Sequence, residues 1–398
     1  MDNEFDIVVV GGGLSGGCLA LSLARAGIKV AVVEAVSDEQ RVNSPAGNRA
    51  LVLSYGSACL MADLDLWDDV SQQATPIKKI HISDSGRFGK ARLSAEREQV
   101  DALGYVIAAR ILEQKIASAL IDSSAELICP ASVVGLETFS ETVRLDLQGE
   151  VSKVSVKARL LVGADGGNSA VRRLLNLGQE SYEYHQSAIV TSVKPEVDPM
   201  GTAYERFTRS GPLAMLPISN GHCSVVWTRK IDETEALMAM DDDEFIAQLQ
   251  QCFGFYLGHL SALGRRIVLP LKLVRANGIT AHRCVLVGNA VHQLHPVAGQ
   301  GFNLGMRDLA VLSDLITDCC SVGDDPGANG LLSAYETARK KDHDRVVGFT
   351  DGVVRLFSND WWPVSAMRGA GLLGLDYSPV SKRFFTRYAM GVGGEKET

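Results

Sequence analysis

A glycine-rich turn near the start of the chain, directly after an apolar run, constrains the fold more than any other feature. Phe5–Val10 is β-branched and uncharged after Asp6, as is typical of a buried parallel strand. Gly11, Gly13 and Gly16 follow with the spacing G-x-G-x-x-G. The first glycine permits a tight turn, the second admits a phosphate, and the third lets a helix pack on the strand. The pattern predicts a cradle for the pyrophosphate of a dinucleotide.

The residues after this turn complete a nucleotide-binding unit. Leu14 to Ala26 is typical of a small-residue helix, so the amides of Leu14 and Ser15 are expected to point at the pyrophosphate. Lys29–Val33 predicts the next strand. Glu34 ends that strand, close to the roughly 20-residue spacing expected of an acid that binds a ribose. Because a carboxylate repels the 2′-phosphate of NADP, the cradle is expected to hold FAD or NAD.

A second apolar strand is predicted in the middle of the chain. Leu160–Val162 runs into the sequence Gly-Ala-Asp-Gly, in which Asp165 is the acid. A helix is expected next, with Asn168 or Ser169 as its N-cap. An ordinary strand-to-helix turn would have the same pattern, so this segment indicates a cofactor site only in combination with the other two glycine-rich segments.

A third segment combines a strand, a turn and a glycine-rich loop. Cys284–Val287 predicts the strand, and Gly288-Asn289 is its turn. The loop begins at His295-Pro296, and Gly299-Gln300-Gly301 lets backbone approach a ligand closely. Phe302–Asp314 predicts a helix whose first amides point at that ligand, where the helix dipole stabilises negative charge.

The three segments together resemble the fingerprints of the class A flavoprotein monooxygenases, the aromatic-hydroxylase family. They occur in the family's order, and the resemblance covers about the first 345 residues. More narrowly, Glu205–Thr208 with Gly211–Pro217, and Gly299–Asp308, resemble the ubiquinone-biosynthesis hydroxylases that act on 2-octaprenyl-6-methoxyphenol. The general family has an aspartate after Gly288 that binds the ribityl chain of FAD. This chain has Asn289 there, whose amide still donates and accepts hydrogen bonds.

The resemblance implies an α/β fold, with a Rossmann-like FAD-binding domain, a discontinuous β-sheet substrate domain and a helical C-terminal segment. The expected boundaries are 1–75, 100–180 and 275–345 for the FAD-binding domain, 76–99 and 181–274 for the substrate domain, and 346–398 for the helical C-terminal segment. The implied activity is ring hydroxylation of a polyprenyl phenol with NAD(P)H and O2, through a C4a-hydroperoxyflavin. No second dinucleotide cradle is found, so NAD(P)H is expected to bind transiently.

The resemblance also implies which residues form the site. Pro296, Gly299 and Gln300 are expected beside the reactive part of the flavin. Arg49 and Arg110 are expected near the FAD phosphates or the ribityl chain, with surface salt bridges as the alternative. The expected cofactor-binding residues are Gly11, Gly13, Leu14, Ser15, Gly16, Glu34, Arg49, Arg110, Asp165, Gly288, Asn289, Pro296, Gly299, Gly301, Phe302 and Asn303.

Other functions are open or disfavoured. A flavin oxidoreductase without oxygen insertion and a non-catalytic flavoprotein subunit of a biosynthetic complex both fit the same motifs. His292 and His295 have no third ligand nearby in sequence and Pro296 breaks the helix, so no metal is expected. The net charge of −8 argues against nucleic acid. The 8 cysteines lack C-x-x-C spacing and the start of the chain is acidic, so a cytoplasmic location is expected.

The C-terminal tail differs from the rest of this acidic protein. Residues 361–391 are net basic and rich in aromatic side chains. The residues concerned are Arg368, Lys382, Arg383 and Arg387 against Asp376, with Trp361, Trp362, Tyr377, Phe384, Phe385 and Tyr388 among them. A helical cap packed on the core is the favoured interpretation. Because the composition also suits an anionic membrane surface, peripheral contact with the inner membrane or with a ubiquinone-biosynthesis complex is a second hypothesis.

Overall fold

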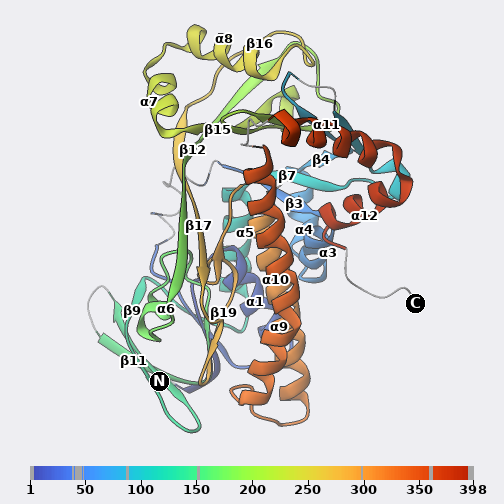
Figure 1. Ribbon diagram of the computed structural model, residues 1–398. Helices are drawn as coiled ribbons and strands as arrows, with labels where there is room; N and C mark the ends of the chain where they lie inside the picture. Colours follow the sequence, from blue (N-terminus) through green and yellow to red (C-terminus); the bar gives the residue numbers. More distant parts are fainter. Residues whose placement is uncertain are drawn as a thin grey trace.

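The computed structural model describes residues 4–37, 40, 47, 49–86, 89–149, 153–296, 299–357 and 362–392. Within these residues the chain forms two large β-sheets, a small third sheet and layers of helices (Figure 1). The structure is the mixed α/β fold that the sequence predicts.

The first large sheet has a parallel centre. Its strands are β1 (Glu4–Val10), β2 (Val30–Val33), β8 (Glu126–Ile128), β9 (Ala131–Thr138), β10 (Val143–Gly149), β11 (Lys153–Gly163), β18 (Thr280–Ala281) and β19 (Cys284–Leu286). The order is β18-β19-β11-β1-β2-β8, and β10 and β9 continue from β11 as antiparallel strands. Ile7, Val8 and Val9 are fully buried, as expected of a parallel strand covered on both faces. The carboxyl ends of β1, β11 and β19 therefore meet at one edge.

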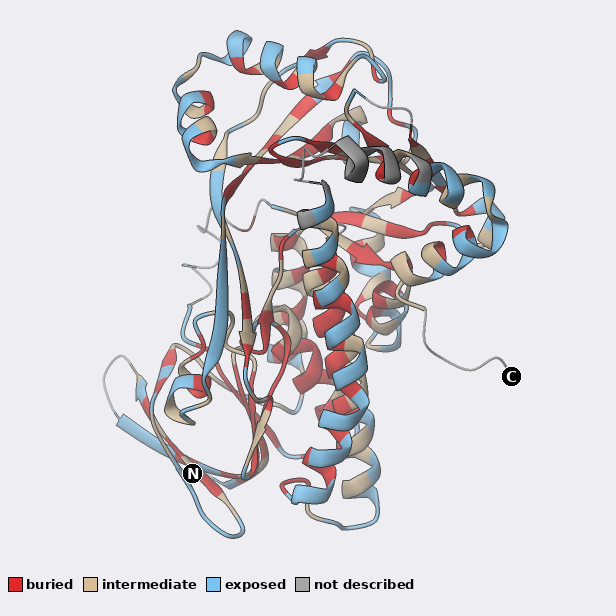
Figure 2. Ribbon diagram, in the orientation of Figure 1, coloured by how far each residue is buried: buried red, intermediate tan, exposed pale blue. Residues whose placement is uncertain are grey.

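Four helices pack together beside this sheet. They are α1 (Leu14–Arg25), α5 (Ala109–Asp122), α9 (Gln300–Ser321) and α10 (Asn329–Phe357). α1 packs against α5 and α9, and α9 packs against α10. Figure 2 shows that α9 and α10 have buried inner sides and exposed outer sides. The predicted helix over Phe302–Asp314 was too short, because the apolar stripe of α9 continues through the buried Ile316.

The second large sheet is mostly antiparallel. Its strands are β5 (Lys79–Asp84), β6 (Lys90–Ser94), β12 (Gln179–Pro195), β13 (Thr202–Thr208), β14 (Gly211–Pro217), β15 (Cys223–Lys230), β16 (Leu260–Ser261), β17 (Ile267–Ala276) and β20 (His292–Gln293). The order is β20-β17-β12-β15-β14-β13-β5-β6, with β16 beside β12 and β13 parallel to β5. The turn residues of Ser210–Pro212 and Asn220–Gly221 predict strands over 202–207, 213–217 and 223–228, and the structure confirms these strands. β12 and β17 are long strands that run between the upper and lower parts of the molecule (Figure 1).

One face of the second sheet is covered by α7 (Ile231–Ala239) and α8 (Asp242–Phe253). The acidic residues that begin at Asp241 predict a helix over 241–251 with a solvated face. Asp241 does cap α8 and its acidic first turn is exposed. Its other face is core, where Phe245 packs edge-on against Trp227 with ring centroids 5.6 Å apart. The opposite face of the sheet is left to line a cavity.

A small sheet and the last helices close the structure. The remaining elements are β3 (Ala50–Ser54), β4 (Thr75–Ile77), β7 (Gly104–Ala108), α3 (Tyr55–Asp63), α4 (Trp67–Ser71), α6 (Ala170–Leu174), α11 (Trp362–Tyr377) and α12 (Pro379–Ala389). α11 and α12 pack on β6, and Met390 is buried beside Leu93 and Leu103. The tail thus includes the packed cap that its sequence favours; Trp361 lies outside the described residues.

Two negative findings concern the described helices. Gly369, Gly371 and Gly374 repeat the G-x-G-x-x-G spacing, but they lie within α11 and no strand precedes them, so they do not form a second cradle. In the part of the chain that the structure describes, no helix has both the length and the apolar character needed to cross a bilayer.

Candidate active site

The N-terminal turn has the geometry of a phosphate cradle. Gly11 has φ +104°, and a Cβ there would lie 2.5 Å from the carbonyl oxygen of Ala164. A Cβ on Gly16 would lie 2.0 Å from the carbonyl oxygen of Gly11, so α1 can pack this closely only with glycine. A Cβ on Gly13 would meet nothing within 4 Å, and no side chain caps α1. The first amides of α1 are therefore open to an anion.

Glu34, at the end of β2, stabilises this cradle by accepting backbone hydrogen bonds. One carboxylate oxygen accepts the Gly12 amide at 2.7 Å, and the other accepts the Val36 amide at 2.7 Å. The side chain is buried and lines the same cavity as Gly11 and Gly13. Each oxygen keeps a lone pair, so the carboxylate can also accept a ribose hydroxyl.

Asp165 presents an unpaired oxygen to the cavity. Its Oδ2 accepts the amides of Ala170 and Val171 at 2.6 and 3.1 Å. Its Oδ1 is buried without a partner although the residue lines the cavity. A buried acceptor is costly unless a ligand donates to it, and a sugar-alcohol hydroxyl is such a donor. Ser169, one of the two predicted N-caps, accepts the Arg172 amide at 2.9 Å.

The late glycine-rich loop lies against the first cradle. Gly288 has φ +59°, and a Cβ there would lie 3.0 Å from Ser15 Oγ. Gly299 has φ +60° and precedes α9, whose N-terminus no side chain caps. A Cβ on Gly301 would meet nothing within 4 Å, so this position opens into the cavity. The loop thus leads into a second helix N-terminus that no side chain caps; residues 297 and 298 lie outside the described residues.

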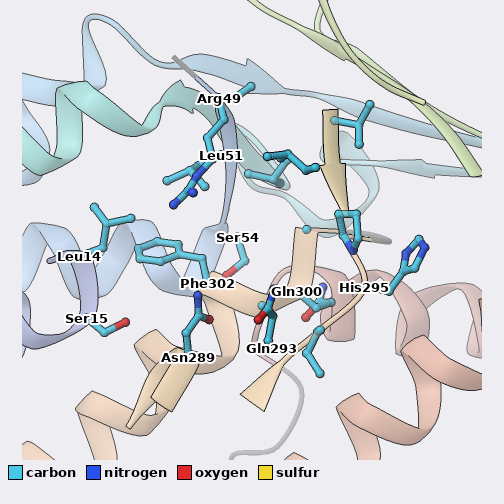
Figure 3. A pocket seen from close by; sticks show the side chains of 18 of the residues that line it. Leu14, Ser15, Arg49, Leu51, Ser54, Asn289, Gln293, His295, Gln300 and Phe302 are labelled. Carbon is cyan, nitrogen blue, oxygen red and sulfur yellow. The ribbon is translucent and has the colours of Figure 1, made fainter. Parts of the chain in front are cut away.

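Most of the catalytic and cofactor-binding residues predicted from the sequence line one cavity. Leu14, Arg49, Asn289 and Phe302 surround one space in Figure 3. The predicted residues that line the cavity are Gly11, Gly13, Leu14, Ser15, Glu34, Arg49, Asp165, Asn289, Pro296, Gly299, Gln300, Gly301 and Phe302. Gly16, Arg110, Gly288 and Asn303 do not line it.

The four remaining residues support the wall from behind or lie beside it. Asn303 uses its whole side chain: its Oδ1 accepts from Ser54 N and Ser57 Oγ, both at 2.8 Å, and its Nδ2 donates to the carbonyl oxygens of Val52 and Gly299. It therefore fixes the loop to β3. Arg110 is half-buried on α5, and Glu113, one turn later on the same helix, lines the cavity instead.

A buried ion network holds the late loop to α9 and α10. Asp308 accepts Arg339 Nε at 2.7 Å and His343 Nε2 at 2.6 Å, and its other oxygen accepts the Gly288 amide at 3.4 Å. Burial alone would raise the pKa of Asp308, but the neighbouring His343, His292 and Arg339 hold it well below its usual range. No local sequence pattern predicts this network, because its members come from two helices.

The same network includes His292, Asp308 and His343, whose ligand-type atoms all lie within 4.8 Å of one another. A cation there would have to compete with Arg339 for Asp308, so the cluster is better described as an ion pair than as a metal centre. Burial lowers the pKa of His292 to about 4. His295, the other member of the predicted histidine pair, packs instead on Tyr184 with ring centroids 5.3 Å apart.

Beyond the loop the cavity becomes apolar. It measures about 1010 Å³ in all, at the upper end of ligand pockets. The inner face of the second sheet, together with α10, α11 and α12, encloses its far end. Representative lining residues are Ile82, Ala214, Val226, Leu271, Phe349 and Leu375. One cavity thus joins a polar cradle for a dinucleotide to a chamber for an apolar molecule.

Comparison with known proteins identifies the family. Residues 4–350 match the family described as "FAD binding domain". The chain is 37% identical to ubiquinone hydroxylase UbiL of Rhodospirillum rubrum, over 98% of this chain and 90% of that protein. It belongs to the FAD-dependent aromatic hydroxylases. It is also 31% identical to the 3-demethoxyubiquinol 3-hydroxylase of Escherichia coli, over 97% of this chain and 98% of that protein.

The solved structures agree on the fold of this FAD-dependent hydroxylase. The p-nitrophenol 4-monooxygenase PnpA from Pseudomonas putida superimposes with a TM-score of 0.81 at 19% identity, with 99% of each chain covered. FAD is therefore the dinucleotide that the cradle serves. The residues present fit it: two uncapped helix N-termini and the unpaired Asp165 Oδ1 face the cavity.

Proposed function

We propose that this FAD-dependent hydroxylase adds one oxygen atom to the ring of a prenylated phenol in ubiquinone biosynthesis, converting 2-polyprenyl-6-methoxyphenol to the benzoquinol. The observation that carries the proposal is the single cavity that joins the flavin cradle to an apolar chamber. The ubiquinone hydroxylase relatives support the same class of substrate. When bound, FAD takes electrons from NAD(P)H and activates O2 for transfer to the ring.

The protein's own residues bind, orient and exclude water. We propose that Gly11, Gly13, Leu14 and Ser15 hold the pyrophosphate and that Glu34 binds the adenosine ribose. Arg49, Asp165 and Asn289 are assigned to the phosphates and ribityl chain. The loop of Pro296, Gly299, Gln300, Gly301 and Phe302 is assigned to the flavin ring, with Gly16, Arg110, Gly288 and Asn303 supporting the site. The apolar sheet face and α11 keep water from the reacting atoms.

The division into domains is part of the same proposal. The first sheet draws its strands from 4–33, 126–163 and 280–286, and the second from 79–94, 179–276 and 292–293. This interleaving supports a discontinuous FAD-binding domain over 1–75, 100–180 and 275–345. The substrate domain is then 76–99 and 181–274, with the helical segment 346–398 covering both.

Precursor analysis in cells tests the proposed step. In an aerobic strain that lacks this protein, mass spectrometry of the quinone precursors should show accumulation of a polyprenyl-methoxyphenol. A different stalled precursor would place the enzyme at another ring position. An unchanged quinone pool would contradict the proposed role in ubiquinone biosynthesis.

We further propose that the C-terminal helices touch the inner membrane, through which a lipid-tailed substrate would arrive. Tyr377, Val380 and Phe384 are 82%, 80% and 65% exposed, and Arg383 and Arg387 lie exposed beside them. Val380, Arg383, Phe384 and Arg387 recur with a spacing of three or four, so they share one face of α12. Exposed apolar and basic residues on one face suit an anionic lipid surface.

The opposite side of the same helices lines the cavity, through Leu372, Phe385 and Tyr388. Truncation of the tail would therefore open the chamber, so surface substitutions make the better test. The triple variant Tyr377→Ser, Val380→Ser, Phe384→Ser should lose flotation with vesicles that contain anionic lipid, while it keeps its FAD. Equal flotation of the variant and the parent protein would contradict the membrane contact.

A further inference from the structure

An acid lies on the apolar face of the second sheet. Glu205 is on β13, where the residues directly opposite it are Ala214 on β14 and Ile82 on β5. The same row of the sheet continues through Val226 on β15 and Val190 on β12. Among the described residues of this sheet that line the cavity, Glu205 is the only one with a carboxyl group. The small side chain of Ala214 leaves space beside it.

The carboxyl group of Glu205 has no hydrogen-bond or ion-pair partner among the described residues. Burial away from water, with no contribution from a neighbouring charge, raises the pKa of Glu205 to about 7. The surface that the side chain keeps faces the cavity. The side chain is half-buried on an apolar surface, where a carboxylate without a partner is unfavourable, so its placement calls for a ligand that donates a hydrogen bond.

The other charged groups around Glu205 are engaged or lie on the other face. Towards the cavity, Asp84 on β5 pairs with Arg368 of α11, Nε to Oδ2 at 3.3 Å, while Tyr388 of α12 and His295 of the late loop are uncharged near neutral pH. On the opposite face are Tyr204, His81, Lys90, Arg92 and Arg206, which gather around the ring of Tyr256 or next to it. Glu34, Arg49, Glu113 and Asp165 line the cofactor end of the cavity.

His295 is the strongest rival. Both of its ring nitrogens are buried without a partner, and it also lines the cavity. Burial lowers its pKa to about 4, however, so a proton taken up by this ring is held weakly. Glu205 is the better proton acceptor near neutral pH, because its pKa lies near the pH of the medium.

We propose that Glu205 is a catalytic residue that takes the proton of the substrate's phenolic hydroxyl; this rests on the proposed function. The phenolic O–H bond breaks, a new O–H bond forms on a Glu205 oxygen, and the electron pair stays on the ring oxygen. The phenolate then pushes electron density into the ring carbons ortho and para to it. After oxygen transfer, the C–H bond of the attacked carbon breaks, its electron pair restores the aromatic ring and its proton passes to solvent, while Glu205 returns its own proton to the ring oxygen.

The kinetic test uses 2-methoxy-6-farnesylphenol as the probe and compares wild type, Glu205→Gln, Glu205→Asp and the control Glu235→Gln, which lies exposed on α7. In wild type, kcat/KM should rise with pH through about 7. Glu205→Gln should lower it about 100-fold and remove this dependence, as expected for loss of a general base. Glu205→Asp should recover part of the rate, and the control should match wild type. FAD content and substrate-free reduction by NAD(P)H should be equal in all four.

A binding test gives a second readout without turnover. The probe and its methyl ether are titrated against the oxidised holoenzyme above pH 7, and binding is followed by the change in flavin absorbance. Wild type should prefer the phenol about tenfold or more, because only the phenol can donate to the carboxylate, and Glu205→Gln should lose that preference.

The outcomes separate this assignment from the proposed function. If wild type hydroxylates the probe and Glu205→Gln keeps the same rate and pH profile, the assignment to Glu205 is overturned and the function stands. If wild type prefers the phenol through Glu205 but forms no hydroxylated product, the acceptor role stands and the proposed hydroxylation fails.

Discussion

Replacing Glu205 with glutamine is expected to stabilise the protein at about pH 8 but not near pH 4.5. The pKa of this carboxyl group is raised from 4.5 to about 7 in the folded protein. Below 4.5 both the folded and unfolded states are protonated, so the group has no effect. As the pH rises towards 7 only the unfolded chain gives up its proton, so folding stability falls. Above pH 7 the folded protein keeps the full loss of stability that the charged carboxylate causes. Glutamine stays neutral throughout.

The size of this effect follows from the shift. The interval between 4.5 and about 7, at 1.36 kcal/mol per pKa unit, sets an upper bound of about 3 kcal/mol. Because water in the open cavity solvates the carboxylate, an effect of about 1–2 kcal/mol is expected. For a chain of 398 residues this corresponds to about 1–3 °C in Tm.

Thermal unfolding measures this stabilisation. The proteins compared are Glu205→Gln, wild type and Glu235→Gln, at matched FAD content. The Tm difference between Glu205→Gln and wild type should increase from about pH 5 to about pH 8, while the exposed control shows no such change. A difference that is the same at both pH values would refute the reasoning, because it would mean that the carboxyl group is not desolvated.

Three further predictions concern the cofactor site and its support. Gly301→Asp should fold but lose FAD affinity at least about tenfold, since its side chain enters the open approach to α9; a purified variant with stoichiometric FAD would count against the loop assignment. Asp308→Asn should lower stability by about 1–3 kcal/mol, or about 1–4 °C in Tm, because Arg339 and His343 lose a charged acceptor while Asp342 still pairs with Arg339; an unchanged melting curve would contradict this. Glu34→Gln should raise the Kd for FAD about tenfold, measured by flavin fluorescence, because it removes a charged acceptor; equal affinity would exclude a ribose contact.

Much of the cofactor cradle could be predicted from the sequence because it is local. The spacing of Gly11, Gly13 and Gly16 reflects the turn from β1 into α1, where Gly16 lies against Gly11, so the local sequence predicts this geometry. The contact of Gly11 with Ala164 comes from the end of another strand, β11. The strands around Asp165 and Gly288 were predicted in the same way. That the three segments serve one cofactor was inferred from family resemblance, and in the structure β19, β11 and β1 lie side by side.

The chamber and its support could not be predicted from local pattern. Glu205 lies in the segment Glu205–Thr208 that resembles the ubiquinone-biosynthesis hydroxylases, yet nothing in this segment predicts which face of β13 the side chain occupies or that its cross-strand neighbours are apolar. Asp308 and Arg339 are far apart in the chain, and only the packing of α9 on α10 joins them. The tail composition indicated a surface role, but the burial of Arg368 depends on Asp84 of a distant strand.

The most direct test of the central claim is a single turnover under isotopically labelled oxygen. Purified enzyme with bound FAD is mixed with NAD(P)H, 2-methoxy-6-farnesylphenol and ¹⁸O₂, and the extracted product is analysed by mass spectrometry. The account predicts a product in which one ring hydrogen is replaced by a hydroxyl group carrying one ¹⁸O atom. Consumption of NAD(P)H with only hydrogen peroxide formed, or a product without label, would contradict it.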